Sequence, residues 1–189
     1  MILALKTNDN VLVAFTHNEV QESIWSLTNE SLYENVPFFS SSECAKTIFI
    51  GVGLYREVDL VRYQSFLKPS LDTHQIIKDI VPYLENIYRA YGRLYKEQEF
   101  HGDFLIAQDN ELFVIKDDKT VHIIDTYFVN HYDDLTRSYL FIHRHLPIKE
   151  KLLKVLEDVC QQNSIQAYPM LVTDTKSQQI KIIHSREDL

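Results

Sequence analysis

The apolar residues in the first part of the chain fall into short runs that are separated by polar turns. Residues 2–6 and 11–15 are almost wholly apolar, and Asn8-Asp9-Asn10 lies between them. Two buried strands that flank a turn of this composition predict a β-hairpin. Runs rich in apolar and aromatic residues predict further strands at residues 24–27 (a short strand or a sheet edge), 38–40 and 47–52.

Two later stretches repeat apolar residues at intervals of three and four, which is the spacing of one helix face. The first stretch comprises residues 56–67. The second begins at a cap formed by Asp72 or Thr73 and is expected to continue to about Lys96. Pro82 lies inside this second stretch and predicts a kink there. The apolar face of the second stretch consists of Ile76, Ile80, Leu84, Ile87, Tyr91 and Leu94.

Three short apolar runs, joined by polar turns, open the second half of the chain. Loops this short join only antiparallel neighbours, so the runs predict a three-stranded meander. The predicted strands are residues 104–107, 111–115 and 120–124.

The rest of the chain is expected to form a loop, two helices and a hairpin. Residues 127–132 are expected to be the loop. Asp133 or Asp134 then caps a helix that continues to about His145, and Pro147 opens a second helix. Apolar residues 170–173 and 180–183 flank a polar turn and predict a closing hairpin.

This order of elements predicts an α+β fold, a four-layer αββα sandwich in which two antiparallel sheets lie between pairs of helices. The chain has 189 residues, which is a usual length for a single domain. No internal repeat or linker interrupts it, so we expect residues 1–189 to form one domain.

The composition excludes several classes of function. The formal net charge of −8 argues against binding to nucleic acids or anionic membranes, which needs clustered Lys and Arg. Only four glycines are present, and they form no phosphate-binding loop. No apolar run approaches the ~18 residues of a membrane span. We expect a cytoplasmic protein without a cofactor.

Three local patterns resemble those of proteasome β-type subunits, which are N-terminal nucleophile hydrolases. MILALKTNDNVLVAF is similar to the first hairpin of that family. TIFIGVGLYREVDLV is similar to its strand, glycine turn and first long helix. HGDFLIAQDNELFVIKDDKTVHIID is similar to its three-stranded meander. The helix pair and the closing hairpin complete the same order, so the resemblance covers nearly the whole chain.

The resemblance also implies catalytic residues, and this chain departs from the family at each of them. In the family, an N-terminal Thr, Ser or Cys attacks the substrate and its own amine acts as the base. Here Met1 takes the nucleophile's place, and Ile2 disfavours its removal. Thr16-His17 stands where the family has a carboxylate, and no lysine lies between residues 29 and 42. The resemblance therefore predicts a catalytically degenerate member, a pseudoenzyme.

A non-catalytic member of this fold class is expected to act through association. By resemblance, the chain is expected to form a homo-oligomer or to bind a protein partner, with a monomer or simple dimer as the alternative. The tyrosines Tyr83, Tyr88, Tyr91 and Tyr95 suit either a core or a binding surface.

A second resemblance is to aminoglycoside phosphotransferases and choline kinases, and it rests on His101-Gly102-Asp103. In those small-molecule kinases the Asp of this motif accepts the substrate's hydroxyl proton, and a later Asp holds Mg²⁺. Asp103 and Asp125 would take these roles. The family's second metal ligand is an Asn at the position of Gln108. No glycine-rich nucleotide lobe is recognisable before His101.

The remaining candidates are cysteines and histidines. Cys44 and Cys160 are far apart in sequence, and we expect both to be reduced and structural. A hydrolase site relocated to Cys44 is a third hypothesis. His131, near two aspartates, and the pair His143 and His145 lack the spacing of a zinc site, so we expect no metal.

Overall fold

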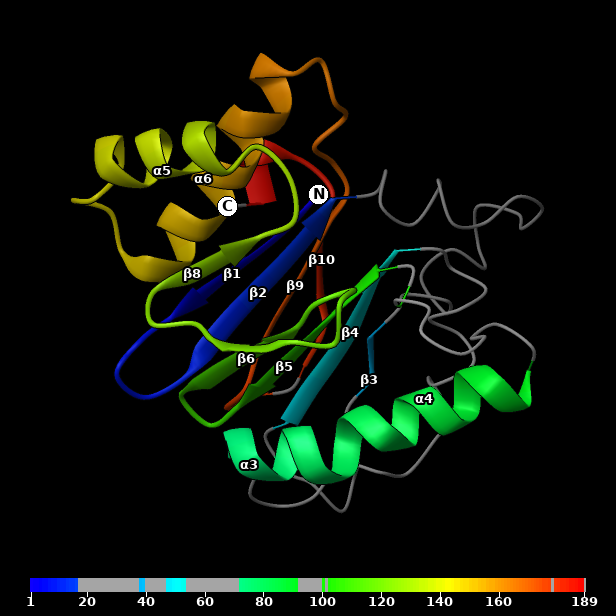
Figure 1. Ribbon diagram of the computed structural model, residues 1–189. Helices are drawn as coiled ribbons and strands as arrows, with labels where there is room; N and C mark the ends of the chain where they lie inside the picture. The colour runs from blue at the N-terminus through cyan, green and yellow to red at the C-terminus, as the bar shows by residue number, and fades with distance from the viewer. Residues whose placement is uncertain are drawn as a thin grey trace.

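The computed structural model describes residues 1–16, 38–39, 47–53, 72–91, 100, 102–177 and 179–188. Its strands form two five-stranded sheets, and every pair of neighbouring strands is antiparallel (Figure 1). The mixed α+β class with two antiparallel sheets, predicted from the sequence, is therefore confirmed.

Sheet A has the strand order β10-β9-β2-β1-β8. The predicted first hairpin forms its centre, and Thr7 N donates to Asn10 O at 2.8 Å to close the turn. The closing hairpin adds to the other side of β2. The strands are β1 Ile2–Lys6, β2 Val11–Thr16, β8 Tyr127–Val129, β9 Met170–Asp174 and β10 Lys181–Ile183.

Sheet B has the strand order β3-β4-β5-β6-β7 and contains the predicted meander. Asp109 (φ 51°) and Lys119 (φ 71°) adopt the left-handed conformation in its two turns. The strands are β3 Phe38–Phe39, β4 Thr47–Gly53, β5 Gly102–Gln108, β6 Glu111–Ile115 and β7 Val121–Ile123.

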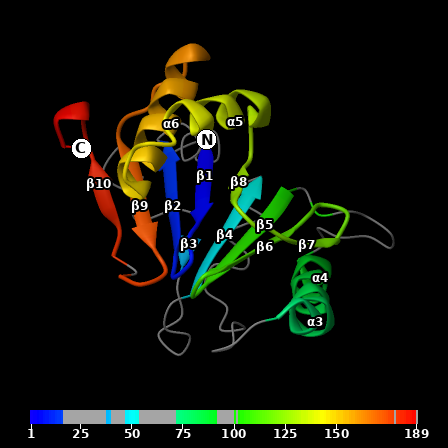
Figure 2. The same ribbon diagram turned by 90° about the vertical axis from the view of Figure 1, so that its left-hand side faces the viewer.

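The helices lie on the outer sides of the two sheets (Figures 1 and 2). α5 Asp133–Ile142 and α6 Ile148–Gln162 lie against sheet A. On the side of sheet B, α3 Thr73–Gln75, a π-helical turn Ile76–Ile80 and α4 Val81–Ala90 form one continuous segment. A short 3-10 helix, Arg186–Asp188, follows β10.

Three apolar clusters hold these elements together. Successive residues of β1 point to opposite faces of sheet A. Leu3 and Leu5 belong to the cluster with α6, whereas Ile2 and Ala4 belong to the cluster between the sheets. A third cluster joins sheet B to α4. Both sheets are therefore covered on two faces, which explains why their strands are apolar runs rather than alternating ones.

Two predictions for the segment after the meander are wrong. Residues 127–129, expected in a loop, form β8 and pair with β1 at the edge of sheet A. The next helix is not capped by the side chain of Asp133 or Asp134: both lie in its first turn, and the N-cap is Tyr132 in the left-handed conformation (φ 62°). This helix ends at Ile142, before the predicted His145.

The helix predicted to start at residue 72 begins as expected but differs in detail. The side chain of Asp72 accepts a hydrogen bond from Gln75 N at 2.8 Å and caps it. A π-helical turn precedes α4, and Pro82, where the sequence predicted a kink, lies in the first turn of α4. Tyr91, expected on the buried face, is 62% exposed.

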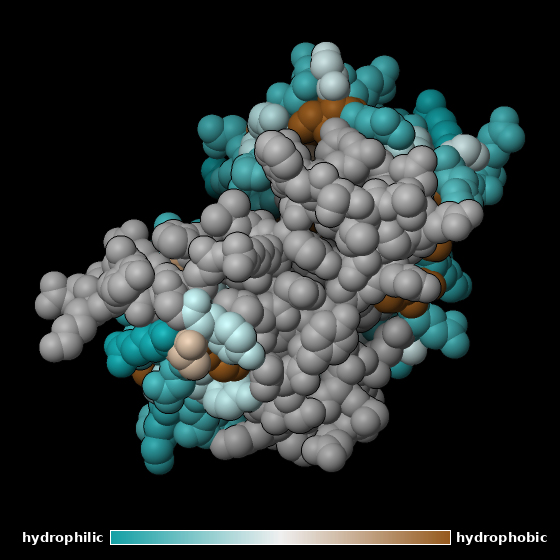
Figure 3. All heavy atoms as spheres, turned by 90° about the vertical axis from the view of Figure 1, so that its right-hand side faces the viewer, coloured by the Kyte–Doolittle hydropathy of each residue, from teal (hydrophilic) through white to brown (hydrophobic). Residues whose placement is uncertain are grey.

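Several predictions lie outside the described residues. They are the strand at 24–27, the helix at 56–67, the end of the second helix with Leu94 and Tyr95, and the cysteine Cys44. None of the described helices has the length and apolar character needed to cross a membrane. On the face shown in Figure 3, the described atoms are mainly hydrophilic with small hydrophobic groups among them.

Candidate functional site

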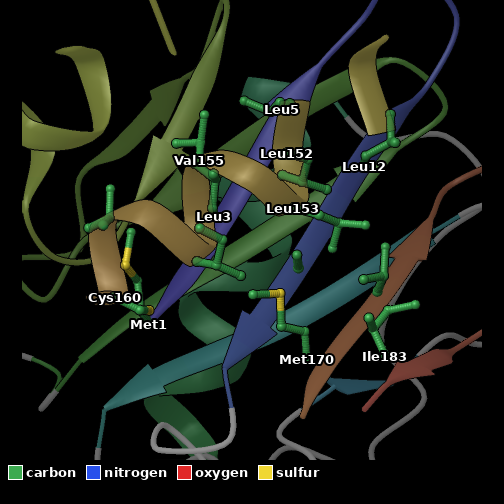
Figure 4. Packing of buried hydrophobic residues seen from close by; sticks show 14 residues of the cluster. Met1, Leu3, Leu5, Leu12, Leu152, Leu153, Val155, Cys160, Met170 and Ile183 are labelled. Carbon is green, nitrogen blue, oxygen red and sulfur yellow. The ribbon is translucent and has the colours of Figure 1, made fainter. Parts of the chain in front are cut away.

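By the resemblance described from the sequence, the start of β1 is where a proteasome-type nucleophile would be expected. Met1 stands there, and its side chain is only 2% exposed. It lies in the cluster beneath α6, next to Cys160 (Figure 4). A thioether is not among the side chains that form covalent acyl intermediates. The structure thus places a buried apolar side chain at this position.

A hydroxyl and an amide contact the backbone at the start of β1. The nitrogen of Met1 donates to Thr16 Oγ1 at 2.6 Å, and Thr16 N donates back to Met1 O at 2.9 Å. On the other side of β1, Ile2 N donates to Asn130 Oδ1 at 2.8 Å. Thr16 is fully buried. These contacts fix the start of β1 between β2 and the end of β8.

The residues of the phosphotransferase hypothesis are not brought together. Asp103 begins β5 and forms an ion pair with Lys116, just beyond the end of β6. Asp125 lies near the other end of β6, since the preceding Ile124 N donates to Leu112 O at 2.8 Å. At about 3.3 Å per residue, the two ends of β6 are roughly 15 Å apart along the strand.

Gln108, the third residue of that hypothesis, is also engaged elsewhere. Its side-chain nitrogen donates to Thr47 Oγ1 at 2.6 Å in a buried contact between β5 and β4. Gln108 is itself buried. In this position its amide ties β5 to β4.

The histidine and cysteine candidates form no metal site within the described part of the chain. His143 Nε2 lies 2.6 Å from Asp158 Oδ2, whereas His145 is exposed. His131 packs its ring edge-on against Tyr132, with the ring centroids 6.1 Å apart. Cys160 is a buried thiol.

A pocket of about 710 Å³ opens where sheet A meets α5 and α6. Its walls come from the turn after β1, the segment before β8, the end of α5 and the start of α6. The lining residues used below are Leu5, Lys6, Asn8, Asp125, Tyr127, Arg137, Leu140, Phe141, Arg144, Ile148 and Lys151. A volume in this range is typical of small-molecule sites.

Ion pairs hold two of the pocket's cations in place. Lys6 Nζ lies 2.9 Å from Glu111 Oε2. Arg137 donates to Asp133 Oδ2 at 2.8 Å and to the Tyr127 hydroxyl at 3.3 Å. The Tyr127 hydroxyl donates in turn to Asp133 Oδ1 at 2.8 Å. Arg137 is thereby fixed along the wall of the pocket.

Burial is the main cause that raises the pKa of Tyr127, and Asp133 adds to the rise while Arg137 opposes it. The hydrogen bond to Tyr127 is the main cause that raises the pKa of Arg137. The phenol therefore stays protonated and serves as a donor over the ordinary pH range.

Sequence reasoning missed this pocket. Asp125 was predicted only as a metal ligand of a kinase, and its four cationic neighbours were not predicted to belong to any site. They come from residues 6, 137, 144 and 151, which are adjacent only after β8 pairs with β1 and the α5–α6 layer packs on sheet A. The sequence feature that could have indicated the pocket was the presence of basic residues near the junction of the two predicted helices, α5 and α6.

Comparison with known proteins supports the fold through structure alone. No family model matches the chain, and no curated relative matches it. Among solved structures, BPH from Thiobacillus denitrificans superposes with a TM-score of 0.67 over 92% of this chain and 97% of that one, at 10% identity. Anbu (ancestral β-subunit) from Yersinia bercovieri gives 0.66 over 98% and 87%, at 12% identity.

A third similar structure is Anbu from Hyphomicrobium sp. strain MC1, with a TM-score of 0.62 over 98% of this chain and 88% of that one, at 8% identity. At such low identity the similarity shows the fold and not the activity. The chain has a proteasome-like fold, as the three local sequence patterns indicated.

Proposed function

We propose that this chain is a proteasome-fold protein that does not hydrolyse peptides with a nucleophile at the start of β1, and that it acts by associating with copies of itself or with a protein partner. The observation that carries the proposal is the place of Met1. Its thioether lies in the apolar layer under α6, and a thioether does not form the covalent acyl intermediate that this chemistry needs.

The proposal includes a complete four-layer αββα sandwich. The α5–α6 pair covers sheet A, and α4 covers sheet B. The second helix of that layer is expected from residues 56–67, whose apolar positions have helical spacing.

Association is supported by exposed apolar side chains at one end of the α5–α6 layer. Phe141 is 66% exposed and Ile142 is 52% exposed, and the two are adjacent at the end of α5. Neighbouring apolar residues of this size on a surface favour contact with another protein. Of the two forms of association, the proposal favours a homo-oligomer.

The catalytic half of the proposal is tested with a covalent probe and peptide substrates. One of the similar structures is that of Thiobacillus denitrificans BPH in complex with epoxomicin, which makes BPH a positive control for this probe. We expect no epoxomicin adduct on this chain by intact mass spectrometry and no cleavage of fluorogenic peptides.

Thr16→Val, which removes the only hydroxyl that contacts Met1 in the described structure and keeps its volume, is the matched variant. Peptide cleavage by the wild type that this variant abolishes would contradict the proposal, because it would show that the buried hydroxyl carries the chemistry.

The association half is tested by solution mass. Size-exclusion chromatography with light scattering should give a closed assembly, of roughly ten or more subunits if the chain forms rings. Ile142→Ser should reduce the assembled fraction, while Ile77→Ser, a change of equal chemistry on the far side of the molecule, should not. A monomer at all concentrations would rule out self-association.

A further inference from the structure

The pocket beside α5 combines an apolar wall with a cationic rim. Leu5, Leu140 and Ile148 form the wall, and Phe141 extends it toward solvent. Lys6, Arg137, Arg144 and Lys151 bring four positive charges to the lining, against one lining carboxylate, Asp125. In a chain with a net charge of −8, such a local excess of cations is unusual.

Two of these cations are already neutralised. Lys6 pairs with Glu111, and Arg137 pairs with Asp133. Once these partners and Asp125 are counted, one positive charge remains in excess. An anion in the pocket would therefore find a favourable, though not strongly positive, potential.

Arg144 and Lys151 are the cations that remain for a ligand. The Arg144 guanidinium lies over the Phe141 ring, 4.3 Å from its centroid, and donates to Phe141 O at 3.0 Å. Neither Arg144 nor Lys151 has a carboxylate partner within 4 Å among the described residues. Arg144 is held at the pocket mouth by an aromatic ring and a carbonyl, which leaves other N–H donors of the guanidinium unused.

Lys151 differs from an ordinary surface lysine because it is half-buried. It lies on the first turns of α6, directly before the fully buried Leu152. An anion bound in the pocket would form a charge-assisted hydrogen bond with this ammonium. The apolar wall beside it would at the same time bury the hydrocarbon part of a ligand.

We infer that this pocket binds a small amphipathic anion, in which a carboxylate or an equivalent monoanionic head contacts Arg144 and Lys151 and an apolar body lies against Leu140, Phe141 and Ile148. The polar groups of Asn8 and Tyr127 at the opposite wall suit a polar substituent on the ligand. This site is separate from the start of β1, and it meets the proposed association surface at Phe141.

The test uses 1-anilinonaphthalene-8-sulfonate, a fluorescent anion with an aromatic body, on the full chain. Saturable binding at one site per chain is expected. Arg144→Gln and Lys151→Gln should each weaken it about tenfold, the size of a lost hydrogen bond to a charged group. Lys149→Gln, on the same helix outside the lining, makes the same change of charge and should leave binding within twofold.

Two further arms separate the parts of the ligand. Octanoate should displace the dye, whereas inorganic phosphate at the same concentration should not, because it lacks an apolar body. N-phenyl-1-naphthylamine, the uncharged analogue of the dye, should bind the wild type and Lys151→Gln equally. Circular dichroism and the thermal midpoint of each variant establish that it is folded.

The inference is overturned if the Gln variants at 144 and 151 bind the dye like the wild type, or if Lys149→Gln weakens binding as much as they do. Absence of saturable binding to the folded wild type also overturns it. Equal displacement by phosphate and octanoate would show that the apolar wall does not contribute to binding, which also contradicts the inference.

Discussion

His143 Nε2 lies 2.6 Å from Asp158 Oδ2 and joins the end of α5 to the middle of α6. Both side chains are largely shielded, at 14% and 15% exposed. Lys154 Nζ contacts the second oxygen of the same carboxylate at 2.6 Å, so one carboxylate organises the packing of two helices. The Tyr139 ring stacks on His143, with the centroids 6.1 Å apart.

This relationship predicts that Asp158→Asn lowers the free energy of unfolding by about 1–3 kcal/mol, because it weakens two shielded hydrogen bonds to a charged group. Urea unfolding followed by circular dichroism measures the change. His143→Ala should cost a comparable amount, and His145→Ala, at an exposed histidine two residues away, should stay within about 0.5 kcal/mol. Equal losses for the two histidine variants would contradict a structural role for the pair.

A second prediction concerns Tyr168, whose hydroxyl donates to Glu157 Oε1 at 3.1 Å. Burial, with the Glu157 carboxylate adding to it, raises the pKa of Tyr168 to about 12 from its ordinary value of 10.0. The folded state therefore holds the phenolic proton more tightly than the unfolded chain. This stabilisation is complete below pH 10 and is lost as the pH rises through 12.

The expected outcome is a fall in the free energy of unfolding between pH 10 and pH 12 that is shallower in Tyr168→Phe. Denaturant titrations at several pH values provide the measurement. Tyr91→Phe, at an exposed tyrosine, is the matched variant and should follow the wild-type curve. A wild-type slope that Tyr168→Phe leaves unchanged would argue against the phenol as its source.

Local sequence patterns predict best the elements whose bounds are set by residues close together in the chain. The first hairpin, the meander and α6 agree with their predicted ranges because turn residues and apolar spacing both specify them. The pairing of β8 with β1 was missed, since it joins residues more than 120 positions apart. Tyr-Phe-Val at 127–129 has the composition of a strand, but three residues between polar segments read as a loop.

The candidate site was harder to predict than the fold for a related reason. Tyr132 adopts a left-handed conformation that propensity assigns to Asn or Gly rather than Tyr, so the N-cap of α5 could not be predicted from the sequence. The pocket depends on this helix, on β8 and on the turn after β1 at once. Its cations have no common sequence motif, and only packing brings them together.

A third prediction tests the apolar layer between sheet B and α4. Leu84 is fully buried there, whereas Ile77, on the π-helical turn, is 54% exposed. Leu84→Ala should lower the free energy of unfolding by about 2–5 kcal/mol through lost contacts and a cavity. Ile77→Ala should stay within about 0.5 kcal/mol. Similar values for both, measured by urea unfolding, would mean that α4 does not pack as described.

The last prediction concerns the phosphotransferase hypothesis. Phosphoryl transfer requires the base and the metal ligand to meet around one substrate, but Asp103 is paired with Lys116 at one end of β6 and Asp125 lies near the other. Isothermal titration calorimetry should therefore detect no saturable binding of Mg-ATP. Asp125→Asn should leave the titration unchanged. Saturable Mg-ATP binding that Asp125→Asn abolishes would contradict the separation of these residues and restore the kinase hypothesis.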